Sequence, residues 1–267
     1  MAFDAFWRRT ACVVAMFIAA AAVGVRADDK PIPVRVGGYQ FEPFVEGSGG
    51  LSIAFAKFLS EQQNNYRFEF MEIPARRRYD LLMSGKIDMI FFELPLWGWN
   101  EQADDIVTST PLIRGQEVFV ARRDHPLGLA VFDALHKRRI ALTFGYHYAF
   151  AGLASDPDDI RARYNVVFAQ QQLYTLRHLV SGNADLAVLN DMFLARQIEN
   201  NASLADILRV GERVDQRYEL PVLMRRGGPI SVKALNEILE QLKADGRFSA
   251  FLADNDAPAS ATLPEGF

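Results

Sequence analysis

The stretch LMSGKIDMIFFE at residues 82–93 decides the fold, because LVSGNADLAVLN at residues 179–190 repeats its pattern. Both read as a helix end, a glycine, an aspartate and then a short apolar run. Glycine at a helix end supplies the left-handed turn that other residues resist. Short continuous apolar runs are typical of strands covered on both faces. The repeat therefore predicts two similar α/β halves.

A second repeat precedes the first in each half. PVRVGGYQF at residues 33–41 and RIALTFGYHY at residues 139–148 both read as a strand that leads into Gly-Tyr-x-aromatic. Strand, helix and strand in this order form a right-handed βαβ unit. Alone, each Ser-Gly match would be an ordinary helix-to-strand turn. Because parallel sheets bind ligands beyond the carboxyl ends of their strands, we expect one shared cleft.

The first 27 residues have the parts of a secretory signal peptide. Two arginines, Arg8 and Arg9, precede an apolar run at 12–25, and small residues stand before a mature start near Asp28. An uncleaved membrane anchor is the alternative, but the run is shorter than the ~20 residues of a span. We expect a cleaved signal peptide at 1–27 and a periplasmic protein.

Composition excludes several classes of function. The single cysteine, Cys12, lies inside the predicted signal peptide, so the mature chain offers no thiol catalysis and no disulfide. Cleavage would remove three arginines and one aspartate and change the net charge from -4 to about -6, which argues against a nucleic-acid partner. The four histidines show no metal-ligand spacing. We expect no cofactor and no metal.

The length suffices for two moderate lobes, since domains usually contain roughly 100–150 residues. We place the junction between the halves near Phe119–Arg123, a strand at 218–224 and an amphipathic helix at 231–242. The predicted domains are 28–120 for the first part of lobe 1, 121–217 for lobe 2, 218–254 for the return to lobe 1, and 255–267 for a loose tail.

The chain resembles the bacterial extracellular solute-binding proteins of family 3, the polar amino-acid receptors of ABC importers. The resemblance covers nearly the whole mature chain. It rests on an ordered set of fragments: Phe41–Phe44, Gly50–Ile53, Ser84–Asp88, Thr110–Pro111, Gly145, Gly182–Asp185, Leu235–Leu239 and Lys243–Gly246.

The resemblance implies a type II periplasmic-binding-protein fold, with two α/β lobes joined by a two-strand hinge. Lobe 1 would come from both ends of the chain and lobe 2 from the middle. A small-molecule ligand would close the lobes of a monomer, and an ABC permease would recognise the closed form. A ligand-sensing role for a membrane signalling receptor is the alternative.

This sequence departs from the family at the positions that hold an α-amino acid. Asn100 stands where the family has an arginine for the ligand carboxylate, and Glu93 stands where small hydroxyl residues are usual. Tyr146 and His147 replace a threonine, and Asn190, followed by Asp191, replaces the acidic residue for the amino group. A standard α-amino acid held in the standard way is therefore in doubt.

The expected cleft is aromatic around one carboxylate, Glu93. Aromatic faces attract cations by ~0.5–2 kcal/mol each, and a partly desolvated carboxylate pairs with an ammonium, so we expect an amine-bearing or flat ligand. Trp97 and Trp99 could instead pack between the lobes without touching ligand. The predicted ligand-binding residues are Tyr39, Phe41, Arg77, Glu93, Trp97, Trp99, Tyr146, His147, Tyr148, Asn190 and Asp191.

Two residues are candidates for an anion holder. Arg77 follows Pro74 at a helix start, as in family members that lack the usual arginine, although a solvated basic helix start is the alternative. His147 could bind a ligand carboxylate, although a lone histidine is more often a hydrogen-bonded wall residue. The sequence leaves both choices open.

Catalysis is the main rival class, because dehydratases and lytic transglycosylases occur on this fold. Glu93 in an aromatic pocket could act as a general acid with His147 as its partner. No nucleophile-base motif, carboxylate pair or phosphate loop accompanies them, so we expect a binding protein and not an enzyme.

Overall fold

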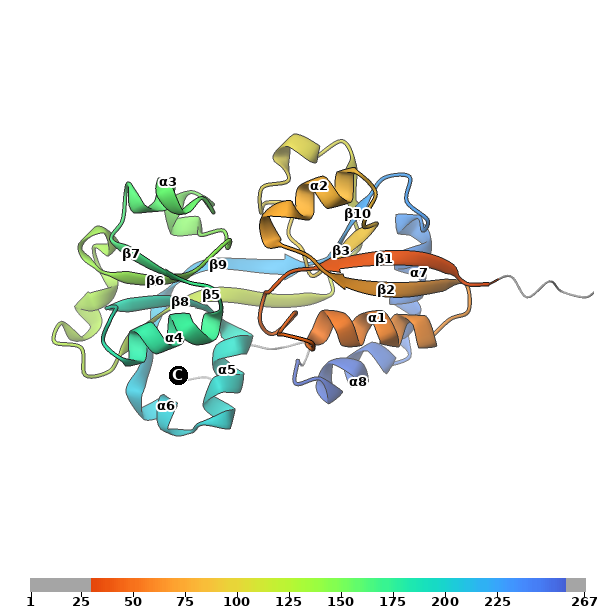
Figure 1. Ribbon diagram of the computed structural model, residues 1–267. Helices are drawn as coiled ribbons and strands as arrows, with labels where there is room; N and C mark the ends of the chain where they lie inside the picture. Colours follow the sequence, from red (N-terminus) through yellow and green to blue (C-terminus); the bar gives the residue numbers. More distant parts are fainter. Residues whose placement is uncertain (1–29, 258–267) are drawn as a thin grey trace, which may run out of the picture. The chain divides into compact units, whose positions relative to one another are not determined.

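The computed structural model describes residues 30–257, so the predicted signal peptide at 1–27 and residues 258–267 of the predicted tail lie outside it. Two five-stranded mixed sheets organise the chain (Figure 1). The first has the order β2 (Tyr66–Glu72), β1 (Ile32–Gly38), β3 (Met89–Phe91), β10 (Val222–Arg225) and β4 (Ile106–Thr108). In it β1 pairs in parallel with β2 and β3, whereas β10 runs antiparallel to its neighbours.

The second sheet repeats this pattern strand for strand. Its order is β7 (Val166–Ala169), β6 (Ile140–Thr143), β8 (Leu186–Asn190), β5 (Ile113–Arg122) and β9 (Leu208–Leu220). Here β6 is parallel to β7 and β8, and β5 is antiparallel to β8 and β9. Gly85 and Gly182, before β3 and β8, have φ angles of 67° and 75°. The predicted α/β repeat with left-handed glycine turns is confirmed.

Helices cover the first sheet on both faces. Figure 1 shows α1 (Leu51–Glu61) and α8 (Arg247–Asp254) on one side and α2 (Arg78–Met83) on the other. Phe55 of α1 contacts Phe91 of β3 and Phe251 of α8, with ring centroids 4.9 and 5.4 Å apart. The predicted amphipathic helix is α7 (Val232–Ala244), which begins where Ser231 Oγ accepts from Ala234 N–H.

The second sheet carries α3 (Pro157–Arg161), α4 (Gln172–Val180), α5 (Asp191–Asn200) and α6 (Ser203–Ile207). Leu176 and Leu179 of α4 are buried against apolar residues of β5 and β8. Their spacing is that of one face of a helix, as the sequence predicts. A separate apolar cluster around Phe119 and Tyr148 fills the other face of this sheet.

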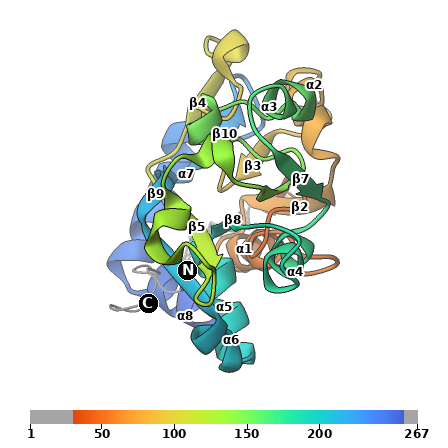
Figure 2. The same cartoon turned by 90° about the vertical axis from the view of Figure 1, so that its left-hand side faces the viewer.

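Two antiparallel strands, β5 and β9, connect the sheets (Figures 1 and 2). The chain enters β5 after β4 ends at Thr108, and it returns from β9 to β10 across Pro221. Sequence analysis places the junction near Phe119–Arg123, whereas Phe119 already pairs with Val188 of β8 in the second sheet. The apolar run Val118–Ala121 lies entirely in the part of β5 that pairs with β8, so it marks the second sheet and not the junction.

Candidate functional site

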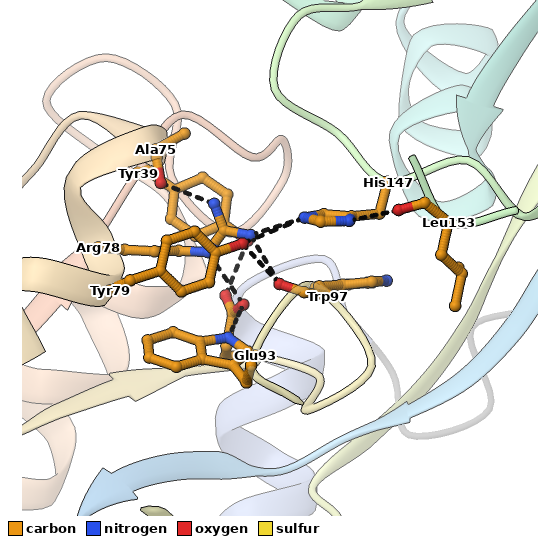
Figure 3. Close-up of polar contacts among 9 residues, drawn as sticks. Tyr39, Ala75, Arg78, Tyr79, Glu93, Trp97, His147 and Leu153 are labelled. Carbon is orange, nitrogen blue, oxygen red and sulfur yellow. Dashed lines mark hydrogen bonds and ion pairs between the residues drawn. The ribbon is translucent and has the colours of Figure 1, made fainter. Parts of the chain in front are cut away.

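A buried ion pair stands beside the end of β3. The Nε of Arg78, at the start of α2, donates to Glu93 Oε1 at 3.2 Å, and the two side chains are 2% and 1% exposed. Arg78 also donates through Nη1 to Ala75 O at 2.6 Å and through Nη2 to Trp97 O at 3.0 Å. Its guanidinium is therefore held by both charge and backbone carbonyls (Figure 3).

Both carboxylate oxygens of Glu93 are occupied. Tyr39 OH donates to Oε2 at 2.7 Å, and Trp99 Nε1 donates to Oε1 at 2.8 Å. Burial raises the pKa of Glu93, and Arg78, Trp99 and Tyr39 act to lower it. Arg78 also lies over the Tyr39 ring at 4.9 Å and the Tyr79 ring at 4.3 Å. Sequence analysis treats Glu93 as a carboxylate free for a ligand, but here it already has a cation.

His147, after β6, joins this cluster from the second half of the chain (Figure 3). Burial lowers the pKa of His147 to about 4, so the ring is neutral at pH 7. Nδ1 lies 2.8 Å from Leu153 O and donates to it, which leaves Nε2 to accept from Arg78 Nη2 at 3.0 Å. An acceptor of this kind cannot pair with a ligand carboxylate without changing its tautomer or charge.

An aromatic cavity adjoins the ion pair. Phe41 meets Trp97 and Tyr146 edge to face, with centroid distances of 5.4 and 5.2 Å. Trp97 Nε1 donates to Gln216 Oε1 at 3.1 Å. The space that this cavity leaves for water is only about 10 Å³. Its lining consists of Tyr39, Phe41, Trp97, Glu117, Gly145, Tyr146, His147 and Gln216. Both halves of the chain and both connecting strands thus contribute to one site.

Glu117 of β5 is the carboxylate in this lining, and it is 2% exposed. Its Oε1 accepts from Tyr218 OH at 3.3 Å, whereas Oε2 has no hydrogen-bond partner among residues 30–257. Burial raises the pKa of Glu117 well above its usual value, and the charges of Asp191 and Asp215 raise it further. The sequence analysis does not select this residue.

The end of β8 is used for helix capping. Asn190 Oδ1 accepts from Met192 N–H and Phe193 N–H at 3.0 and 3.1 Å, the arrangement of an N-cap for α5. Its Nδ2 donates to Tyr218 OH. We expect Asn190 and Glu93 to face each other because they end equivalent strands, but each side chain is fully buried among its own partners. Equivalent strand ends therefore do not carry equivalent roles.

Two other predicted residues lie away from the aromatic cavity. Asp191 accepts from Gln116 N–H at 3.3 Å and lines a separate hollow with Arg114 and Arg217. Tyr148 is fully buried, and its OH accepts from Thr143 N–H and donates to Thr143 O. Tyr148 thus stabilises the loop between Thr143 and itself. Trp97 lines the aromatic cavity, whereas Trp99 donates a hydrogen bond to Glu93.

The predicted anion holder, Arg77, is not among the residues that line the aromatic cavity. Arg77 is exposed, and its neighbour Arg78 turns inward to Glu93. Residues Ala75–Arg77 form a 3-10 turn before α2 begins at Arg78. That turn has about three residues rather than 3.6 per revolution, so a count from Pro74 does not predict which arginine faces inward.

Sequence reasoning misses Arg78, Glu117 and Gln216. Glu117 does carry a signal: a carboxylate that directly precedes the apolar run Val118–Ala121, which forms a buried central strand. Gln216 lies in the largely polar strand β9, and its sequence context does not distinguish it from the other polar residues of that strand. Only its pairing with Glu117 places it at the cavity. The tertiary structure brings both to the cavity.

Within residues 30–257, no group of three or more histidine, cysteine or acidic side chains could hold a metal ion. No helix in this described part of the chain has the length and apolarity to cross a membrane.

Solved structures share this fold at low sequence identity. A mutant of ArgBP from T. maritima is 18% identical, covers 84% of this chain and 94% of its own, and gives a TM-score of 0.62. The BvgS VFT2 domain of Bordetella pertussis, a double mutant, is 23% identical, with coverages of 84% and 93% and a TM-score of 0.60. The GluR0 ligand-binding core from Nostoc punctiforme, in complex with L-glutamate, is 15% identical, with coverages of 85% and 100% and a TM-score of 0.64.

The sequence comparison is more specific than these shared folds. No protein with a curated description matches the chain. Residues 36–254, however, match the sequence pattern of the bacterial extracellular solute-binding proteins, family 3. This match covers more than half of the chain and agrees with the two-sheet fold and its two connecting strands. The chain therefore belongs to the bacterial extracellular solute-binding proteins, family 3.

Proposed function

We propose that this protein captures a small polar, amine-bearing solute, an amino acid or a derivative, in the aromatic cavity by closure of its two lobes. The observation that carries the proposal is the lining itself. Tyr39 and Phe41 come from the first lobe, Tyr146 and His147 from the second, and Glu117 from a connecting strand. A solute in that place contacts both lobes at once and stabilises the closed arrangement.

Charge and aromatic composition support the amine. The cavity places several aromatic side chains beside a buried carboxylate, and such faces attract cations. The arginine nearest to the cavity, Arg78, already pairs with Glu93, which disfavours an acidic solute. The solved neighbours include an ancestral arginine-binding protein bound to arginine, with 19% identity and a TM-score of 0.63. From this neighbour we infer for this chain only that its solute bears an amine, and not that the solute is arginine.

The free volume requires movement. About 10 Å³ admits no more than roughly one water molecule, so a solute enters when the lobes separate. In this structure, direct hydrogen bonds join the two lobes: Arg78 Nη2 with His147 Nε2, and Gln172 Nε2 with Glu42 O at 2.8 Å. The free energy of solute binding must therefore exceed the free energy of the contacts that are lost when the lobes separate.

In this proposal the chain is exported with cleavage of residues 1–27, acts in the periplasm as a monomer, and delivers its solute to an ABC permease. Neighbouring genes test the delivery step: permease and ATPase genes would support import, whereas a receptor kinase or cyclase gene would replace it with sensing. Mass spectrometry that finds residues 1–27 on the exported protein would contradict the cleavage.

A thermal-shift screen followed by calorimetric titration tests the binding. The panel contains L-arginine, L-glutamine, L-glutamate, putrescine and choline. A bound solute at 100 times its dissociation constant adds about 2.7 kcal/mol to the free energy of unfolding. We expect a cationic member to raise the melting temperature and L-glutamate to leave it unchanged. Stabilisation by none of the five would contradict the proposal, and stabilisation by L-glutamate alone would contradict the preference for a cationic solute.

Chemical analysis separates binding from catalysis. After incubation, the bound solute should be recovered unchanged. A new product formed in proportion to the amount of protein would show an enzyme instead, and the loss of that product in Glu93→Gln would identify the general acid.

A further inference from the structure

We infer that Glu117, and not Glu93, is the carboxylate that binds the cationic group of the solute. The inference rests on the proposed function and names the residue that selects for charge. Glu117 lines the cavity, and its buried Oε2 has no hydrogen-bond partner in the described part of the chain. Both oxygens of Glu93 have partners.

A buried hydrogen-bond acceptor without a partner destabilises the folded state, and more so when it is charged. Native proteins retain few such groups, and each one calls for an explanation. An ammonium or guanidinium donor from a solute would supply the missing partner as well as the missing charge. Glu117 lines the cavity in which the proposed solute binds, so such a donor could reach its carboxylate.

The backbone around Glu117 is irregular at this point. The β5–β9 pairing keeps one register up to Glu117–Gln216 and then shifts between Glu117 and Val118, and again before Val120. A bulge re-aims a side chain and is over-represented next to functional sites. The irregularity lies in a connecting strand, at the residue where β5 begins to pair with β8 of the second sheet.

Charges around Glu117 favour a cation. The two charged groups that act most strongly on it, Asp191 and Asp215, are both negative. The titratable side chains that share the cavity lining are Tyr39, Tyr146 and His147, and His147 is neutral at pH 7 because burial lowers its pKa. Burial raises the pKa of Glu117, and a cationic solute that favours the charged carboxylate should lower it again and so release protons on binding.

Two matched variants test the inference. Glu117→Gln removes the charge and keeps the shape. Glu237→Gln makes the same change at an exposed glutamate of α7, outside the cavity lining. Each is titrated calorimetrically with L-arginine, putrescine and choline. We expect the affinity for the cation that wild type binds to fall about 10- to 150-fold in Glu117→Gln and to stay within about 3-fold in Glu237→Gln.

Proton release gives a second readout. Titration of wild type in phosphate and in Tris should give different apparent enthalpies, with release of up to one proton per bound cation, and Glu117→Gln should abolish that difference. A melting curve accompanies each variant, and Glu117→Gln should melt no lower than wild type.

The outcomes separate this inference from the proposed function. If wild type binds a cation and Glu117→Gln binds it equally well, Glu117 is not the selector, whereas the function stands. Loss of folding in Glu117→Gln, or an equal loss of affinity in Glu237→Gln, would also overturn the inference. If wild type binds none of the three cations, the amine class and the role of Glu117 both fail.

Discussion

Two buried glutamates, one at the end of β3 and one in β5, differ in how their charge is balanced. Glu93 has an arginine, a tyrosine and an indole as partners, all from its own lobe. Glu117 Oε1 accepts from Tyr218 OH at 3.3 Å, and its Oε2 has no hydrogen-bond partner among residues 30–257. We therefore assign Glu93 to the structure of its lobe and infer that the solute supplies the missing partner of Glu117.

Removal of Arg78, the cation that pairs with Glu93, should have the largest effect on the free energy of unfolding. Arg78→Leu leaves Glu93 buried without its counter-charge, and loss of one member of a buried pair costs about 3–5 kcal/mol. Urea denaturation measures the change. Arg77→Leu is the control, since Arg77 is exposed and surface changes usually stay within about 0.5 kcal/mol. Equal losses in the two variants would mean that the Arg78–Glu93 pair does not stabilise the lobe.

Acid should lower the free energy of unfolding, because it protonates His147, which contacts Arg78 of the ion pair. The folded-state pKa of His147 is about 4, below its ordinary value of 6.5, so its contribution is present above pH 6.5 and is lost as the pH falls toward 4. We expect wild type to lose up to about 2–3 kcal/mol more than His147→Gln over this range. Unfolding measured from pH 7 to 4 compares the two, and parallel profiles would remove His147 from the account.

Tyr39→Phe should make Glu93 resemble Glu117. Tyr39 OH is the partner that the described residues provide for Glu93 Oε2, so its loss leaves a buried oxygen unsatisfied. The free energy of unfolding should fall by about 1–3 kcal/mol. The matched control is Tyr164→Phe, which removes a 2.9 Å hydrogen bond to the backbone oxygen of Phe150 in the other lobe. A loss in Tyr164→Phe as large as that in Tyr39→Phe would mean that the contact with Glu93 gives Tyr39 no special role.

Tyr79→Phe should have the smallest effect. Tyr79 OH donates to Trp97 O at 2.7 Å, but that carbonyl also accepts from Arg78 Nη2, so it keeps a partner. We expect a loss of about 0.5–1.5 kcal/mol in thermal unfolding. A loss as large as that of Arg78→Leu would show that Tyr79, and not the ion pair, organises the site.

The sequence alone was sufficient to predict the repeat and the two α/β halves. Glycine turns, helical spacing and apolar strand runs depend on neighbours a few residues apart, so the halves around Gly85 and Gly182 could be recognised directly. It also placed Tyr39, Phe41, Trp97, Tyr146 and His147 together, and all five line the cavity. Their use by a ligand stays a prediction.

Tertiary structure alone decided which charges are free. Whether Glu93 is available depends on the inward turn of Arg78, fifteen residues earlier, and Glu117 gains its importance from a sheet in which Asn190 and Gln216 flank it. Sequence spacing reports local conformation. The pairing of a buried charge depends instead on side chains that folding brings together from distant segments, because desolvation makes each missing or added partner decisive.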